Sequence, residues 1–203
     1  MYNEKNTKPI AVIVLLTVFF SYIFLENYSY ELTNRESTIS HIARHINDHG
    51  FLENSMLGEQ TKRSPFFAWL SLFFSGGQIS HFTLRLVSVI SLLGIALISF
   101  FSAKRFGGIK SAWPALAFSM TSVAVVNMAT RAEEGLLTAF FMACAWLSWY
   151  SISRKSKRWF KAWFWGIFFT SLAASVNGPH MYLFFYLPTL FMNRPTDVRK
   201  RLV

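Results

Sequence analysis

Acidic residues, cysteine and charge of any kind are scarce in this 203-residue sequence. It has 10 Asp and Glu residues, and charged residues make up 15% of the chain, against about 25% in an ordinary soluble domain. The single cysteine, Cys144, excludes an intramolecular disulfide framework, and its place in an apolar run is typical of a small helix-packing residue. No internal repeat or low-complexity tract occurs, which favours a single domain over residues 1–203.

Apolar and aromatic residues are abundant instead, at 53% and 18% of the chain, and this surplus requires a lipid solvent. The net charge of +10 would suit nucleic-acid binding, but the basic residues lie at the ends of apolar runs and form no polar face of their own. We therefore expect the lipid bilayer, and no nucleic acid, as the partner of these charges.

The apolar runs predict an all-α integral membrane protein with about six transmembrane helices. A span needs about 17–25 residues, and the runs cover residues 9–25, 82–102, 111–129, 135–152, 159–176 and 181–192. The first run lacks a cleavage site after it, which favours a retained signal anchor. The short sixth run is either a full span or half of a re-entrant hairpin with the fifth, because Asn177-Gly178-Pro179 breaks the helix between them.

The basic residues predict a multi-pass protein with a cytoplasmic N-terminus, in the inner (plasma) membrane if the source is bacterial. Cytoplasmic loops carry an excess of Lys and Arg, and fourteen of the twenty lie in the inner segments when the N-terminus is inside. Eight of the ten acidic residues then fall on the outer side. The opposite orientation would invert both asymmetries.

The outer loop at residues 26–81 is too long for a simple connector and is predicted to contain interfacial helices. Residues 38–49 carry apolar side chains at helical spacing, and Ser37 or Thr38 is positioned to cap this helix. Residues 65–74 are very apolar yet too short to span, which favours a helix lying parallel to the bilayer. Gly76-Gly77 then lets the chain turn into the second span.

Carboxylates just outside the membrane are the main candidates for catalysis. Glu31 and Glu36 follow the first span, and Glu133 and Glu134 stand at the outer mouth of the fourth, so two acidic clusters are expected at one face. A carboxylate at this depth can act as a general base or as a ligand of a sugar or metal. The alternative is a set of solvated loop charges, or of partners for Arg35 and Arg131.

Histidines and cations in the outer loop are candidates for metal and phosphate binding. His41, His45 and His49 form a stripe on the predicted helix and are weak candidates for metal ligands. They lack a fourth ligand and the Glu of the protease motif, which favours hydrogen-bonded or exposed side chains. The sequence indicates no particular cofactor, and a bound divalent metal is an alternative. Lys62 and Arg63 lie where a lipid phosphate would be, either as its ligands or as snorkelling charges.

Several short sequence motifs, taken together, resemble those of one family of membrane enzymes. The outer loop contains Arg35-Glu36, His41-Ile42-Ala43-Arg44-His45-Ile46, His49-Gly50-Phe51 and Arg63-Ser64-Pro65-Phe66-Phe67-Ala68-Trp69. Further marks are Arg85-Leu86, Glu134-Gly135-Leu136-Leu137-Thr138 and Asn177-Gly178-Pro179. Their order and spacing resemble the N-terminal half of the C-superfamily (GT-C) membrane glycosyltransferases, the group that includes protein O-mannosyltransferases and lipid A aminoarabinose transferases.

The resemblance implies transfer of a sugar from a polyprenyl-phosphate donor to an acceptor outside the cytoplasm, which is a lipid, a protein or a glycan. It implies catalysis by Glu36 and Glu134. It also implies that Lys62, Arg63 and Arg85 bind the phosphate of the lipid donor.

Departures from the family pattern leave a second class of function open. The family's catalytic Asp falls on Arg35, and its Lys before Gly-Pro falls on Asn177. Family members also continue through many more spans, so we expect a truncated or impaired enzyme, with a second chain as the partner that supplies the missing spans. The alternative is a non-catalytic membrane subunit, or a decayed relative, that binds lipid or a partner chain.

The division of basic residues generates a topological prediction. A reporter fused after Lys161 should read as cytoplasmic, and one inserted near Asn54 should read as external, because the cation-rich segments stay inside. Paired phosphatase and fluorescent-protein fusions measure this directly. An external signal from the Lys161 fusion would reject the topology.

Overall fold

The computed structural model describes residues 34–49, 55–56, 59–60, 65–77, 80–122, 131–156 and 158–191. The predicted first span at residues 9–25, Lys62 and Arg63 lie outside these ranges. The elements are α2 (Asn34–His49), β1 (Ser55–Met56), β2 (Glu59–Gln60), α3 (Phe66–Ser75), α4 (His81–Gly107), α5 (Ile109–Thr121), α7 (Glu134–Ser156), α8 (Trp159–Asn177) and α9 (Met181–Phe191). Helices dominate the described chain, which confirms the all-α class; the two short strands pair antiparallel, Ser55 opposite Gln60.

Two helices, α4 and α7, are the ones in the described chain that are long and apolar enough to cross a membrane. They match the predicted second and fourth spans, and they favour association of this chain with a bilayer. The helix α4 starts in a capping box, in which Ser80 Oγ accepts the Thr83 N–H at 3.2 Å and Thr83 Oγ1 accepts the Ser80 N–H at 2.9 Å. It continues to Gly107, beyond the predicted end at residue 102.

The third, fifth and sixth predicted runs also contain helices. α8 and α9 reproduce the fifth and sixth runs, and the turn between them lies at Gly178, with φ of 105°, and Pro179. α5 covers the first part of the predicted third span and ends at Thr121, and residues 123–130 lie outside the described chain.

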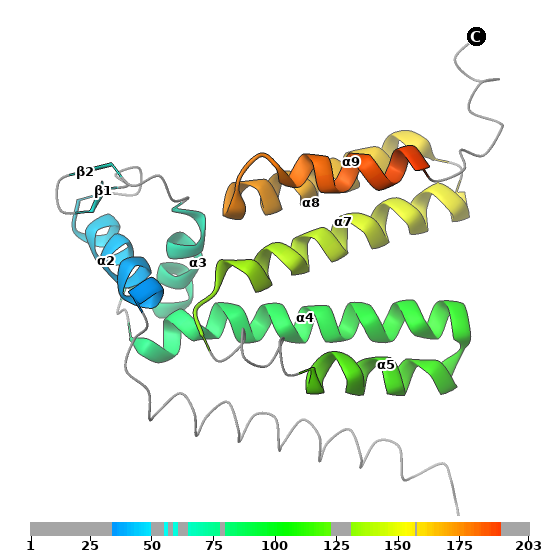
Figure 1. The fold of residues 1–203 in the computed structure, drawn as a ribbon, viewed down its shortest axis with the longest axis horizontal. Coiled ribbons are helices and arrows are strands. Elements are labelled where there is room, and N and C mark those ends of the chain that lie inside the picture. Colours follow the sequence, from blue (N-terminus) through cyan, green and yellow to red (C-terminus); the bar gives the residue numbers. More distant parts are fainter. Residues whose placement is uncertain are drawn as a thin grey trace, which may run out of the picture.

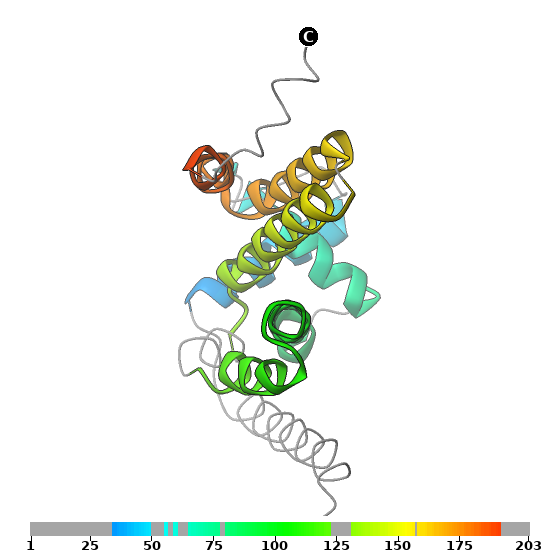
Figure 2. The same ribbon diagram turned by 90° about the vertical axis from the view of Figure 1, so that its right-hand side faces the viewer.

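The long helices run back and forth along one axis (Figures 1 and 2). In Figure 1, α4, α7 and α9 run from left to right, whereas α5 and α8 run from right to left. We call the end that carries α2, α3 and the first turns of α4 and α7 the loop end. The opposite end, with the Gly107–Gly108 turn and the α7–α8 connection at Arg158, is the turn end.

α2 and α3 lie across the loop end instead of continuing the long helices (Figures 1 and 2). The predicted helical spacing in α2 is confirmed, since Ile39, Ile42 and Ile46 are all buried. The predicted cap is wrong, because α2 begins at Asn34 and Ser37 and Thr38 therefore lie inside its first turns.

α3 ends where the sequence predicts a change of direction. Gly76 adopts the left-handed conformation, with φ of 60°, and closes the helix. An apolar core at the loop end connects the helices that meet there. Its buried members are Ile39, Phe67, Leu84, Val87, Ala132, Leu137 and Val176. Five helices or their flanking turns, α2, α3, α4, α7 and α8, therefore meet in one cluster.

Small residues bring the long helices close together. A Cβ built on Gly166 of α8 would lie 2.6 Å from the ring of Phe185 in α9, which is fully buried. Polar Ser and Thr side chains are buried between helices, while large apolar side chains such as Leu97, Phe118 and Phe168 face outward. Small and polar residues inside with large apolar residues outside is the pattern of helices that pack within lipid.

The contact at Gly166 generates a prediction about stability. Gly166→Ala should destabilise the protein, because overpacking costs about 1–3 kcal/mol, more than the ~1 kcal/mol by which Ala exceeds Gly in helix propensity. Gly135→Ala is the matched control, since nothing lies within 4 Å of a Cβ there. Thermal unfolding of the purified chain in detergent should show a lower midpoint for Gly166→Ala only. Equal midpoints for the two variants would contradict this packing.

Candidate functional site

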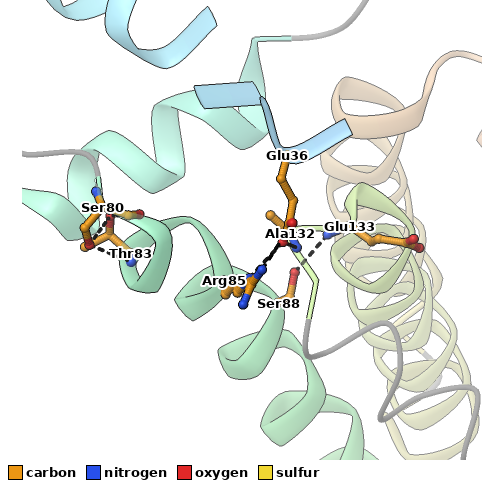
Figure 3. Close-up of polar contacts among 7 residues, drawn as sticks. All are labelled: Glu36, Ser80, Thr83, Arg85, Ser88, Ala132 and Glu133. Carbon is orange, nitrogen blue, oxygen red and sulfur yellow. Dashed lines mark hydrogen bonds and ion pairs between the residues drawn. The ribbon is translucent and has the colours of Figure 1, made fainter. Parts of the chain in front are cut away.

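A buried ion pair joins the outer loop to the long helices. Glu36, in the first turn of α2, and Arg85, in the second turn of α4, have side chains that are 1% and 3% exposed. Arg85 donates from Nε to Glu36 Oε1 at 2.9 Å and from Nη2 to Oε2 at 3.3 Å (Figure 3). This two-pronged arrangement fixes the orientation of both side chains.

The turn that precedes α7 completes the network. The backbone N–H of Ala132 donates to Glu36 Oε1 at 2.9 Å, and the N–H of Glu133 donates to Ser88 Oγ at 3.2 Å. Ser88 is fully buried and lies on the same helix as Arg85, one turn further along. Three segments far apart in the sequence, α2, α4 and the start of α7, therefore converge on one carboxylate (Figure 3).

The surroundings of Glu36 make it a structural anchor in this arrangement. A buried charge is costly unless it is paired and hydrogen-bonded, and here each member of the pair supplies the partner that the other requires. The guanidinium and the backbone N–H of Ala132 occupy both oxygens of the carboxylate with hydrogen bonds. A general base, by contrast, needs an accessible carboxylate within hydrogen-bond reach of the group from which it takes a proton.

The remaining carboxylates at the loop end are more accessible. Glu133 and Glu134 are both half-buried, and Glu134 is the first residue of α7. Figure 3 shows the Glu133 side chain directed away from the Glu36–Arg85 pair. Glu36, Glu133 and Glu134 thus lie at the same end of the molecule, and of these three carboxylates Glu36 is the one bound to Arg85. Glu31 lies outside the described residues.

The other predicted site residues are placed as follows. Arg85 is buried against Glu36, so its guanidinium is not exposed to bind a lipid phosphate at the surface. On α2, His41 is exposed and His45 is half-buried. The side chain of His49 is not among those that the structure describes. Within the described residues, no group of three or more His, Cys, Asp or Glu side chains is placed to hold a metal ion.

The pairing of Glu36 with Arg85 is the feature that sequence reasoning missed. The sequence suggests Arg35 as the neighbour that neutralises Glu36, whereas the observed partner lies 49 residues away. A signal was available, because an arginine four residues into an apolar run must find a partner in the protein interior. The sequence alone leaves open which of several acidic residues that partner is.

Comparisons with protein-family models, with curated proteins and with solved structures find no match for this chain.

The network generates a prediction about coupling. Glu36→Gln should destabilise the protein by about 3–5 kcal/mol, because it leaves the buried charge of Arg85 uncompensated. Arg85→Met should cost a similar amount by isolating Glu36. The double variant Glu36→Gln/Arg85→Met should be less destabilised than the sum of the two, and thermal unfolding of all three variants measures the coupling.

Asp48→Asn is the matched control, since it makes the same change of carboxylate to amide at an exposed position of α2. Its free energy of unfolding should stay within about 0.5 kcal/mol of that of the parent chain. Strictly additive effects of the Glu36 and Arg85 variants would show that the pair is not coupled.

Proposed function

We propose that this chain is a multi-pass membrane protein of the glycosyltransferase type, which handles a polyprenyl-phosphate sugar at its loop end. The loop end is the extracytoplasmic end in this proposal, and six spans cross the membrane with the N-terminus inside. The acceptor is a lipid, a protein or a glycan. The order of sequence marks that resemble the GT-C family supports the reaction class.

One structural observation carries the proposal. The Glu36–Arg85–Ala132 network fastens α2 across the loop end, beside the first residues of α7, and α3 packs against α2 through apolar side chains. A platform of loop helices at the end of a membrane-crossing bundle lies at the depth of lipid headgroups, where the phosphate and sugar of a lipid-linked donor are located. Fixed geometry at that depth is what positioning of two substrates requires.

The network also divides the roles of the two proposed catalytic residues. Glu36 is a positioning residue in this proposal, since its carboxylate is occupied by Arg85 and by the N–H of Ala132. Glu134 takes the role of general base, because it is half-buried at the start of α7 and lies beside that anchor. In this proposal Lys62 and Arg63 bind the phosphate of the lipid donor. Arg85 does not bind it, because its guanidinium is buried against Glu36.

A non-catalytic membrane subunit is the second candidate. The observation in its favour is that Glu36 and Arg85, two of the charged residues best placed for catalysis, neutralise each other in the protein interior. The same network would then serve only to shape a surface that binds lipid or a partner chain.

Single-turnover transfer distinguishes the two candidates. Purified chain is mixed with a radiolabelled undecaprenyl- or dolichyl-phosphate sugar and with lipid, peptide or glycan acceptors. We expect donor binding, with transfer slower than in GT-C enzymes that carry the catalytic Asp, because Arg35 stands at that position. Glu134→Gln should lower the transfer rate by about a hundredfold or more, as expected for loss of a general base.

Glu133→Gln is the matched control, because it makes the same change one residue away and keeps the backbone bond to Ser88. Transfer that survives in both variants would exclude Glu134 as the base. Donor binding without transfer to any acceptor would favour the non-catalytic subunit, and absence of both would reject the proposed function.

A further inference from the structure

Exposed cations gather at the turn end, far from the site described above. We call this group the turn-end patch; it consists of Lys104, Arg105, Lys110, Arg158 and Lys161, all of them exposed. The acidic residues within the described ranges are Glu36, Asp48, Glu59, Glu133 and Glu134, and they belong to α2, β2 and the start of α7. The patch therefore has no carboxylate partner in the described part of the chain.

Side-chain contacts hold the two halves of the patch together. Arg105 of α4 hydrogen-bonds through Nη1 to Ser151 Oγ of α7. Beside it, the rings of Phe106 and Tyr150 meet edge to face, with centroids 5.5 Å apart. These contacts tie the α4–α5 turn to the end of α7, so the cations on either side belong to one surface.

Stabilisation of helix ends explains only part of this surface. Lys104 and Arg105 lie in the last turn of α4, where a cation complements the negative end of the helix dipole. Lys110, however, is the second residue of α5, and Lys161 is the third residue of α8. A cation at a helix N-terminus is disfavoured by the dipole, so these two lysines require another source of negative charge.

Exposed aromatic rings lie beside the cations. Phe106 is 61% exposed and Phe160 is 85% exposed, although both are large apolar side chains. At about 1.5 Å per residue, the 27 residues of α4 span about 40 Å, longer than the ~30 Å hydrocarbon core of a bilayer. Its last turn therefore reaches the headgroup layer, where aromatic rings and cations are both favoured.

We propose that the turn-end patch binds the headgroups of anionic phospholipids, with Lys110 and Lys161 as ligands of the phosphates and Phe106 and Phe160 against the acyl chains. Charge complementarity selects an anionic lipid over a zwitterionic one, because the patch carries five cations and the described acidic residues all lie at the loop end. This assignment requires a bilayer around α4 and α7 and does not rest on the proposed transfer reaction.

Lipid competition on the full-length chain tests the assignment. The purified chain is equilibrated in micelles that contain equal amounts of phosphatidylglycerol and phosphatidylcholine, and native mass spectrometry gives the ratio of the two bound lipids. The wild-type chain should favour phosphatidylglycerol. Lys110→Gln/Lys161→Gln should reduce that preference by roughly 25-fold, since each of the two cations near an anionic surface contributes about a fivefold factor in binding.

The matched control removes two exposed cations from the loop end, as Arg44→Gln/Arg131→Gln. It should keep the wild-type preference, and the charge-retaining Lys110→Arg/Lys161→Arg should keep it as well, which separates loss of charge from loss of folding. Equal losses in the two Gln variants, or displacement of the bound lipid by inorganic phosphate alone, would overturn the proposal.

Discussion

A charge buried in an apolar interior must be neutralised there, and the loop end of this protein is organised around that constraint. Arg85 lies in an apolar helix long enough to cross a membrane, and its guanidinium is inaccessible to solvent. Because α4 contains no acidic residue, the carboxylate that neutralises Arg85 comes from another segment of the chain. Glu36 provides that carboxylate, and its position then fixes where α2 lies against α4.

The same carboxylate also determines where α7 begins. The N–H of Ala132 is bound by Glu36, while the N–H of Glu133 is bound by Ser88, one turn from Arg85 on α4. The chain is thereby held in a turn immediately before the first residue of α7. Ile39, Leu84 and Leu137 belong to the apolar core at this end of the molecule, and the ion pair is almost inaccessible to solvent. Exclusion of water strengthens the ion pair and makes the loss of either partner more costly.

Local sequence patterns predicted the helices well because each pattern depends on residues close together in the chain. The apolar spacing of α2, the length of α7 and the breaks at Gly76 and Gly178 are all of this kind. The start of α2 was missed, since Ser37 and Thr38 are good caps in isolation, yet burial of Glu36 places them inside the helix. Tertiary contact outweighs capping preference there.

The partner of Arg85 was unpredictable for a related reason. Sequence shows that a buried cation needs an anion, but it does not show which acidic residue the fold brings near. Glu36 has Arg35 as its neighbour in the chain, and sequence distance favours that choice. The fold instead pairs residues separated by 49 positions, because α2 crosses the loop end beside the second turn of α4.

This pairing changes the chemical interpretation of the sequence marks. A carboxylate that acts in catalysis and one that is required for folding are the same residue type in a sequence, and only their surroundings in the structure distinguish them. Glu36 is surrounded by donors that stabilise its charge, so its contribution to any reaction acts through the placement of α2 and of the α7 start. In the proposed transfer reaction the general base is therefore a carboxylate other than Glu36, and we assign that role to Glu134, the first residue of the helix that follows the Ala132 turn.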